Sequence, residues 1–142
     1  AHIFFRHRWF GFDDGMYSAA RFLELMDKNN CSADALLEAC PATYSTVELY
    51  IPVSEEAKFS IIGTLQEKLT IPGAHITHMD GIRVETENAW GLHRASNTTP
   101  NLILRFEGDT ARALEQIQAI FRQAIAVLFP ALNLDFLAPS KD

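Results

Sequence analysis

The chain has 142 residues, of which 48% are hydrophobic and 21% charged, a composition typical of a globular domain with its own core. A formal net charge of −6 disfavours general binding to nucleic acid or to an anionic membrane, whereas a local cluster of donors can still bind an anion. No apolar run approaches the roughly 20 residues of a membrane helix, and the first residues lack the layout of a signal peptide. We therefore expect a soluble, cytoplasmic protein whose two cysteines, Cys31 and Cys40, stay reduced.

The part of the chain before Pro41 predicts one strand and two helices. Residues 2–9 read as a strand that begins at the first residue, and because natural domains rarely open inside a strand, we expect that the chain was cut there. The acidic pair at 13–14 is expected to cap a helix that the asparagines at 29–30 end. The expected inward residues of this helix are Met16, Ala20, Leu23 and Met26. Ser32 is expected to cap a second, short helix.

A change of pattern follows. The small, polar stretch PATYST at 41–46 predicts a linker or hinge, and the alternating apolar residues at 47–53 predict a strand. Ser54 is expected to cap a helix, and its expected inward residues are Phe59, Ile62, Leu65 and Leu69. The Asp80-Gly81 pair is a strong signal for a hairpin turn between two short strands. These two strands are expected near Ile76 and Val84.

The last third of the chain predicts two further strands and a long helix. The strands are expected over 90–94 and 102–106, and Asp109 is expected to cap a helix that Pro130 ends. The expected inward residues of this helix are Leu114, Ile117, Phe121, Ile125 and Leu128.

This order of elements predicts an α+β fold. For residues 43–142 we expect a largely antiparallel sheet of four to five strands with two helices on one face, an arrangement like that of the TATA-binding protein. Residues 1–42 are expected to be the closing strand and helices of a preceding α/β domain.

The loop between the last two expected strands concentrates hydrogen-bond donors. Residues 96–99 are Ser, Asn, Thr and Thr, whose short polar side chains can each donate, and successive backbone N–H groups of a tight loop form anion-binding nests. Arg94 at the mouth of the loop adds a guanidinium that matches the geometry of phosphate. The same residue types dominate ordinary hairpin turns, so composition leaves both a phosphate clamp and a plain turn open.

Two separate stretches resemble one enzyme family. The loop sequence RASNTTP at 94–100, followed by LILRFEGDT, is similar to the phosphate-binding loop of the α-D-phosphohexomutases, above all of their bacterial phosphomannomutase/phosphoglucomutase branch. The stretch HIFFRHRWFGFDDGMYSAARFLELM resembles the segment that follows the sugar-recognition loop of that branch. The phosphoglucosamine mutases of the family resemble one another in having Gly where this chain has Asn97 and an acidic residue where it has Thr99, which favours the mannose/glucose branch.

The resemblance implies a function for individual residues. Arg94, Ser96, Asn97 and Thr98 would bind the phosphate that is not being transferred, and His2 would lie near the sugar. Such enzymes interconvert hexose 1-phosphates and 6-phosphates through a bisphosphate, using a phosphoserine and Mg²⁺ in N-terminal domains and a hexose 1,6-bisphosphate activator. The chain shows neither a phosphoserine motif nor an acidic metal loop. The fragment alone is therefore expected to bind no metal and to be inactive without the missing N-terminal domains, its partners together with the hexose phosphate substrate.

Several alternatives remain open at this point. The whole protein could be a phosphoglucosamine mutase with an unusual loop, or the sheet-and-helix domain could be a non-catalytic interaction module. The net charge argues against nucleic acid as a partner. His93 precedes Arg94 and could modulate the site, but a solvated strand histidine is the favoured expectation. Arg105 is expected to face away from the helices, either as a plain surface residue or as part of a positive site.

Overall fold

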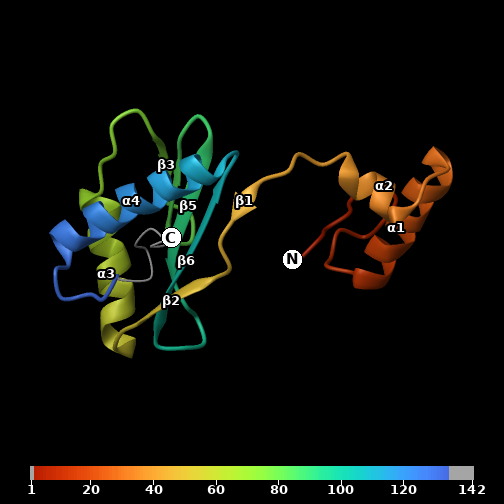
Figure 1. Cartoon of the computed structure of the whole chain (residues 1–142). Coiled ribbons are helices and arrows are strands. Elements are labelled where there is room, and N and C mark those ends of the chain that lie inside the picture. The colour runs from red at the N-terminus through yellow and green to blue at the C-terminus, as the bar shows by residue number, and fades with distance from the viewer. Residues whose placement is uncertain (1, 135–142) are drawn as a thin grey trace. The chain divides into compact units, whose positions relative to one another are not determined.

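The computed structural model describes residues 2–134 and divides the chain into two compact units (Figure 1). The first unit is Ala1–Pro41 and the second is Ala42–Asp142.

The first unit consists of two helices preceded by an irregular segment. Helix α1 spans Gly15–Asn29 and α2 spans Ala33–Glu38. The Asp14 carboxylate caps α1 by accepting a hydrogen bond from the Tyr17 N–H at 2.9 Å. Asn30 ends the helix in the left-handed conformation, at φ 47°. The predictions of both helices and of their boundaries are therefore confirmed.

Two predictions for this unit are wrong. Residues 2–9 do not form a strand, because a strand needs a hydrogen-bonded neighbour and this segment makes only a single bridge between Phe4 and Asp13. The expected inward stripe of α1 is also largely exposed: Met16 is 85% exposed and Leu23 is 63% exposed. No residue of α1 is buried, because among residues 2–41 only an irregular segment and the short helix α2 are available to pack against it.

The second unit is built on a six-stranded antiparallel sheet, so the predicted antiparallel α+β fold is confirmed. Its strands are β1 (Tyr44–Ser45), β2 (Leu49–Pro52), β3 (His75–Thr77), β4 (Ile82–Glu85), β5 (Ala89–Ala95) and β6 (Asn101–Gly108). The strand order is β1-β6-β5-β4-β3, and β2 pairs with β6 as well, alongside β1. The sheet has one strand more than predicted because β1 lies inside the stretch expected to be a linker.

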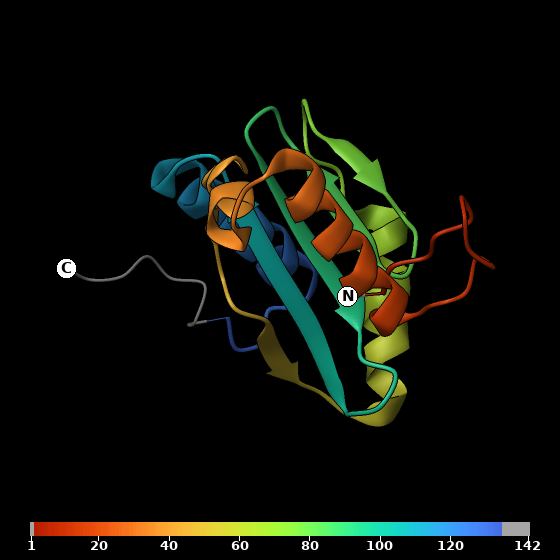
Figure 2. The same cartoon turned by 90° about the vertical axis from the view of Figure 1, so that its right-hand side faces the viewer.

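Two helices cover one face of the sheet, as predicted. They are α3 (Glu55–Lys68) and α4 (Ala111–Leu128), and Figures 1 and 2 show both on the same side of the sheet. The core between these layers includes Leu102, Leu104 and Phe106 of β6, all fully buried. Gly91 of β5 is required here, because an added Cβ would lie 2.6 Å from the ring of Phe121.

Sequence reasoning placed two features of these helices wrongly. The side chain that caps α4 is Thr110, whose hydroxyl accepts from the Ala113 N–H at 3.1 Å, not the predicted Asp109. On α3, Phe59 is 58% exposed, whereas Lys58 is only 1% exposed and begins the inward stripe. Hydrophobic periodicity found the wrong residue because it never counts a lysine as inward.

Candidate phosphate-binding site

The candidate site is the loop that joins β5 to β6. The two strands pair without a break from Ala89 opposite Gly108 to Ala95 opposite Leu102. The Ser96 N–H then donates to the Asn101 carbonyl at 2.9 Å and closes the hairpin. The regular ladder thus fixes both ends of the loop, residues 96–100, in space.

Ser96 organises this loop from the inside. It is 4% exposed, and its hydroxyl oxygen accepts from the N–H groups of Thr98 at 3.4 Å and Thr99 at 3.1 Å. The Thr99 hydroxyl lies 2.8 Å from the same oxygen. This pattern of local side chain to backbone bonds gives the loop a fixed shape without any ligand.

Asn97 and Thr98 are the outward-facing part of the loop. Both are exposed, and among residues 2–134 neither the Asn97 amide nor the Thr98 hydroxyl has a hydrogen-bond partner. These donors are therefore free to bind an anion from solvent.

Arg94 lies at the C-terminal end of β5, on the sheet face opposite the helices. Its side chain is 30% exposed, and its Nη1 lies 3.7 Å from the carboxylate of Asp80. Asp80 is held there by the predicted hairpin turn, in which Asp80 has φ 49° and Gly81 has φ 120°. A side chain at position 81 would collide with the carbonyl of His93, 2.4 Å away, so the turn packs tightly against β5. The guanidinium of Arg94 therefore makes only a long contact with Asp80 and remains partly accessible to an anion from solvent.

Lys58 of α3 contacts the loop, and its role was not predicted from the sequence. Its ammonium donates to the carbonyl of Thr99 at 3.3 Å and lies 2.5 Å from the carboxylate of Glu55. The only signal in the sequence is the position of this lysine. It lies three residues before Ile61 and four before Ile62, at the first position of the buried stripe of α3.

His93 contradicts the expectation of a solvated histidine. It is 1% exposed and faces the helices from between Ile82 and Leu104 on the neighbouring strands. Neither ring nitrogen has a hydrogen-bond partner in the described part of the chain. Burial lowers the pKa of His93 from 6.5 to about 3, so the ring is neutral at physiological pH. A buried, neutral ring on the helix side of the sheet does not contribute to the charge of the loop.

His2, the remaining predicted site residue, belongs to the first unit, whereas the loop belongs to the second. Its Nδ1 hydrogen-bonds to the carboxylate of Asp13, which also accepts from the Ile3 N–H at 3.3 Å. The hydrogen bond from His2 lowers the pKa of Asp13. His2 is thus exposed but held in one orientation by an acidic partner.

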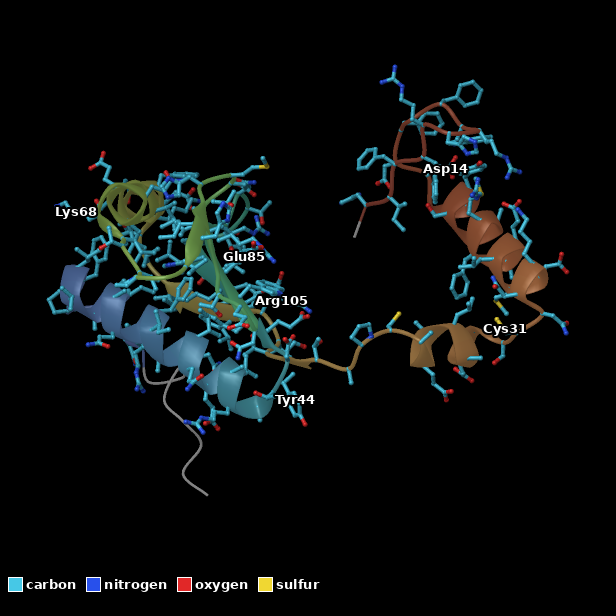
Figure 3. All side chains as sticks on the ribbon, turned by 90° about the horizontal axis from the view of Figure 1, so that it is seen from above. Asp14, Cys31, Tyr44, Lys68, Glu85 and Arg105 are labelled. Atoms are coloured by element: carbon cyan, nitrogen blue, oxygen red, sulfur yellow. The ribbon has the colours of Figure 1, made fainter. Side chains whose placement is uncertain are left out.

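The open face of the sheet carries further arginines. Figure 3 shows Glu85 and Arg105 projecting on the side away from α4, which confirms the predicted orientation of Arg105. Arg83 is already engaged, with its guanidinium 4.0 Å above the Trp90 ring and 2.5 Å from Glu85. Arg105 is exposed and lies on the same face as Arg94, so it provides a matched comparison for that residue.

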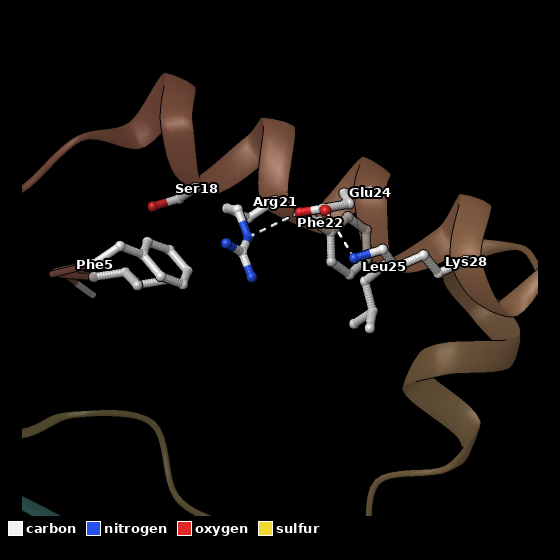
Figure 4. Close-up of a pocket in the computed structure, with 8 residues that line it drawn as sticks. Phe5, Ser18, Arg21, Phe22, Glu24, Leu25 and Lys28 are labelled. Atoms are coloured by element: carbon white, nitrogen blue, oxygen red, sulfur yellow. Dashed lines mark hydrogen bonds and ion pairs between the residues drawn. The ribbon is translucent and has the colours of Figure 1, made fainter. Parts of the chain in front are cut away.

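A hollow of about 320 Å³ in the first unit is lined by both basic and acidic side chains, among them Arg21, Glu24 and Lys28 (Figure 4). Its wall includes Glu24, which is paired with Lys28 at 2.8 Å, Arg8 at 3.0 Å and Arg21 at 3.2 Å. The hydrogen bonds from Lys28 and Arg8 lower the pKa of Glu24 to about 2. One carboxylate thus serves three basic side chains and balances one of their charges, and Nη1 of Arg21 is buried without a hydrogen-bond partner among residues 2–134. Within residues 2–134, no group of three or more His, Cys, Asp or Glu side chains is arranged to hold a metal ion, and no helix is long and apolar enough to span a membrane.

Comparison with known proteins identifies the family. The profile described as "Phosphoglucomutase/phosphomannomutase, C-terminal domain" matches residues 48–124, more than half of the chain and all of the candidate loop. The chain belongs to this family. The family predicted from the loop and from the first 25 residues is therefore confirmed.

Individual relatives agree with this assignment. A phosphomannomutase/phosphoglucomutase of Pseudomonas putida is 50% identical over 135 residues, and a phosphoglucomutase of Neisseria gonorrhoeae is 45% identical over 126 residues. These matches cover 95% and 87% of this chain but only 29% and 27% of the relatives, so the chain spans less than a third of their length. A probable phosphoglucosamine mutase of Methanosarcina acetivorans is less similar, at 32% identity over 120 residues.

A solved structure of the family has the same fold. The phosphoglucomutase/phosphomannomutase family protein of Burkholderia thailandensis superimposes with a TM-score of 0.80 at 40% sequence identity. The match covers 93% of this chain and 28% of that protein.

Proposed function

We propose that this chain is the C-terminal part of a phosphomannomutase/phosphoglucomutase, in which the exposed donors of Arg94, Asn97 and Thr98 bind a phosphate of the hexose phosphate. Ser96 contributes to the same site by shaping the loop that presents them. The observation that carries the proposal is the loop itself: a fixed hairpin end that leaves donors exposed, with an arginine at its mouth. The names of the relatives, which are phosphomannomutase/phosphoglucomutases and phosphoglucomutases, support the reaction class.

The geometry of the loop suits a phosphate that is held and not transferred. The Asn97 amide, the Thr98 hydroxyl and the Arg94 guanidinium can all donate hydrogen bonds to phosphate. Among residues 2–134 no base is hydrogen-bonded to the Thr98 hydroxyl to activate it as a nucleophile. Holding the remote phosphate fixes the reacting end of the sugar, which lowers the entropic part of the barrier. Such donors recognise the phosphate and not the sugar. The same clamp therefore serves both orientations of a hexose bisphosphate intermediate.

The proposal assigns the chemistry to parts of the relatives outside this chain. In this reading the phosphoserine, Mg²⁺ and the activation by a hexose 1,6-bisphosphate belong to N-terminal domains, and this chain alone has no mutase activity. The chain's coverage of only 29% of a relative supports this division.

Residues 1–42 have a separate role in this proposal. They would be the last part of the preceding sugar-binding domain, with His2 beside the substrate. Large apolar side chains that the first unit leaves exposed support a covering by further chain: Phe10 is 80% exposed and Phe12 is 52% exposed.

The mannose/glucose branch is favoured over the glucosamine branch. Asn97 and Thr99 differ from the residues expected of phosphoglucosamine mutases, and the glucosamine relative is less identical than the Pseudomonas and Neisseria relatives. The named relatives are all mutases, so a non-catalytic interaction module is not favoured.

The test is a titration of the isotope-labelled chain with glucose 1-phosphate, mannose 1-phosphate and inorganic phosphate, with sulfate as a control for general anion binding. The readout is the backbone amide shifts of Asn97 and Thr98. We expect saturable shifts confined to the loop, which Arg94→Ala abolishes and Arg105→Ala retains. Equal shifts in the two variants, or shifts spread over other surfaces, would overturn the assignment of the clamp.

A further inference from the structure

Lys58 is a buried cation on α3, next to the candidate loop. Its side chain is 1% exposed, although lysine is among the residues least often buried. An ammonium group is stable in such a place only when it is paired and hydrogen-bonded. Three contacts meet this condition: the Glu55 carboxylate at 2.5 Å, the Thr99 carbonyl at 3.3 Å and the Phe59 ring at 5.0 Å from its centroid.

The pairing with Glu55 does not by itself explain why the lysine is buried. Glu55 is 60% exposed and lies three residues before Lys58 on the same helix, so the two side chains could pair equally well in solvent. The contact with the ring of Phe59, which is 58% exposed, could also form in solvent and does not explain the burial either. Thr99 lies 41 residues away in the sequence, and its carbonyl is the contact that Lys58 makes outside its own helix.

The Thr99 carbonyl is a fixed point of the loop. It accepts a hydrogen bond from the Asn101 N–H at 2.8 Å in addition to the one from Lys58. The N–H of the same residue donates to the Ser96 hydroxyl at 3.1 Å. One end of the loop is therefore held through Ser96 and the other through Lys58, and the exposed residues Asn97 and Thr98 lie between these two anchors.

We infer that Lys58 is a positioning residue for the phosphate clamp, holding the Thr99 carbonyl so that Asn97 and Thr98 keep the conformation in which they bind an anion. The inference rests on the proposed function. Lys58 itself touches no phosphate in this arrangement, because it is buried and its ammonium is already engaged. Its positive charge, partly offset by Glu55, adds to the potential that attracts a dianion to the loop.

The experiment compares Lys58→Met with Lys68→Met, which removes an exposed lysine from the other end of the same helix. Two quantities are measured on the full chain: the Kd for inorganic phosphate, from the amide shifts of Asn97 and Thr98, and the hydrogen-exchange rate of the Asn101 amide. Losing a charge-assisted hydrogen bond to the loop should raise the Kd about tenfold in Lys58→Met and speed Asn101 exchange by a similar factor. Lys68→Met should change neither quantity, and Lys58→Arg should restore most of the affinity because it keeps a buried donor.

The outcomes of this experiment support or overturn the positioning role of Lys58. If Lys58→Met binds phosphate as tightly as the unchanged chain and Asn101 exchanges at the same rate, the inference is overturned. If the unchanged chain binds no phosphate, the proposed clamp fails, and Asn101 exchange alone then shows whether Lys58 holds the loop. If Lys58→Met does not fold, Lys58→Gln replaces it. Its neutral amide cannot donate a charge-assisted hydrogen bond to the Thr99 carbonyl, so the Kd for phosphate should again rise and the Asn101 amide should exchange faster. An unchanged Kd together with unchanged exchange would contradict the inference.

Discussion

The burial of His93 makes the stability of the second unit depend on pH. In the folded state the imidazole has a pKa of about 3, whereas in the unfolded chain its pKa returns to about 6.5. Between these values the unfolded state binds a proton that the folded state does not, so the free energy of unfolding falls as the pH falls below 6.5. A histidine whose folded pKa is lowered thus contributes stability that is fully present above its unfolded pKa and is lost on acidification.

The size of this effect follows from the two pKa values. At pH 5 the folded-state pKa of about 3 lies well below the pH, so the unfolded-state pKa alone sets the difference. The 1.5 units between 6.5 and 5 correspond to about 2 kcal/mol of lost stability, at 1.36 kcal/mol per unit. Other groups also titrate in this range. The quantity to compare is therefore the pH-dependent loss in the unchanged chain and in His93→Leu, which has no imidazole at this position.

The assay is urea denaturation at pH 8 and at pH 5, followed on the amide NMR signals of Leu104 and Phe106 so that only the second unit is observed. We expect the unchanged chain to lose about 2 kcal/mol more than His93→Leu between the two pH values. Any change in stability that the substitution causes through packing is present at both pH values, so it cancels when only the loss between pH 8 and pH 5 is compared. His78→Leu, which removes an exposed histidine, is the matched control and should follow the unchanged chain. Equal losses in the unchanged chain and in His93→Leu would refute the reasoning.

Two further predictions concern Arg94 and the start of α4. The carboxylate of Asp80 lies 3.7 Å from Arg94 and competes with a bound anion for the guanidinium. Asp80→Asn should therefore lower the Kd for inorganic phosphate about threefold at low salt, and by a smaller factor in 0.5 M NaCl. A higher Kd would show instead that the carboxylate helps to position the guanidinium. Thr110→Ala should lower the free energy of unfolding, measured by urea denaturation, by about 1 kcal/mol because it removes the cap of α4. Asp109→Ala should lower it by about 0.5 kcal/mol or less. A larger effect of Asp109→Ala than of Thr110→Ala would reverse the assignment of the cap.

Local features of the fold could be read from the sequence because they depend on residues only a few positions apart. Asp14, Ser32 and Ser54 cap their helices through a bond from the N–H three residues ahead. The turn at Asp80 and Gly81 needs a positive φ that these residue types adopt most easily. The loop from Arg94 to Thr98 is also a contiguous motif, so its residues could be proposed as a site without knowledge of the packing.

The choice of the inward face of β5 could not be read in the same way. One face of this strand carries Trp90 and Leu92, the larger apolar residues, and the other carries Gly91 and His93. Alternation predicts two faces but not which of them the helices cover, and the expectation of a solvated His93 placed the wrong face outward. The rings of Phe106 and Phe121 decide the matter, because they lie so close to β5 that only a residue without a side chain fits at position 91.

The sequence by itself determined the order of the four helices and of β2 to β6, most of their ends, the antiparallel α+β class and the motif of the loop. Each of these follows from short-range hydrogen bonds or from periodicity along one element. Only the tertiary structure decided that Lys58 reaches the loop and that the ring of His93 is buried with no hydrogen-bond partner among residues 2–134. Both facts depend on which elements pack together, and Lys58 and Thr99 are brought into contact across 41 residues by the packing of α3 against the sheet. The free energy of a buried charge or ring is set by those distant neighbours, so no pattern within a single element could reveal it.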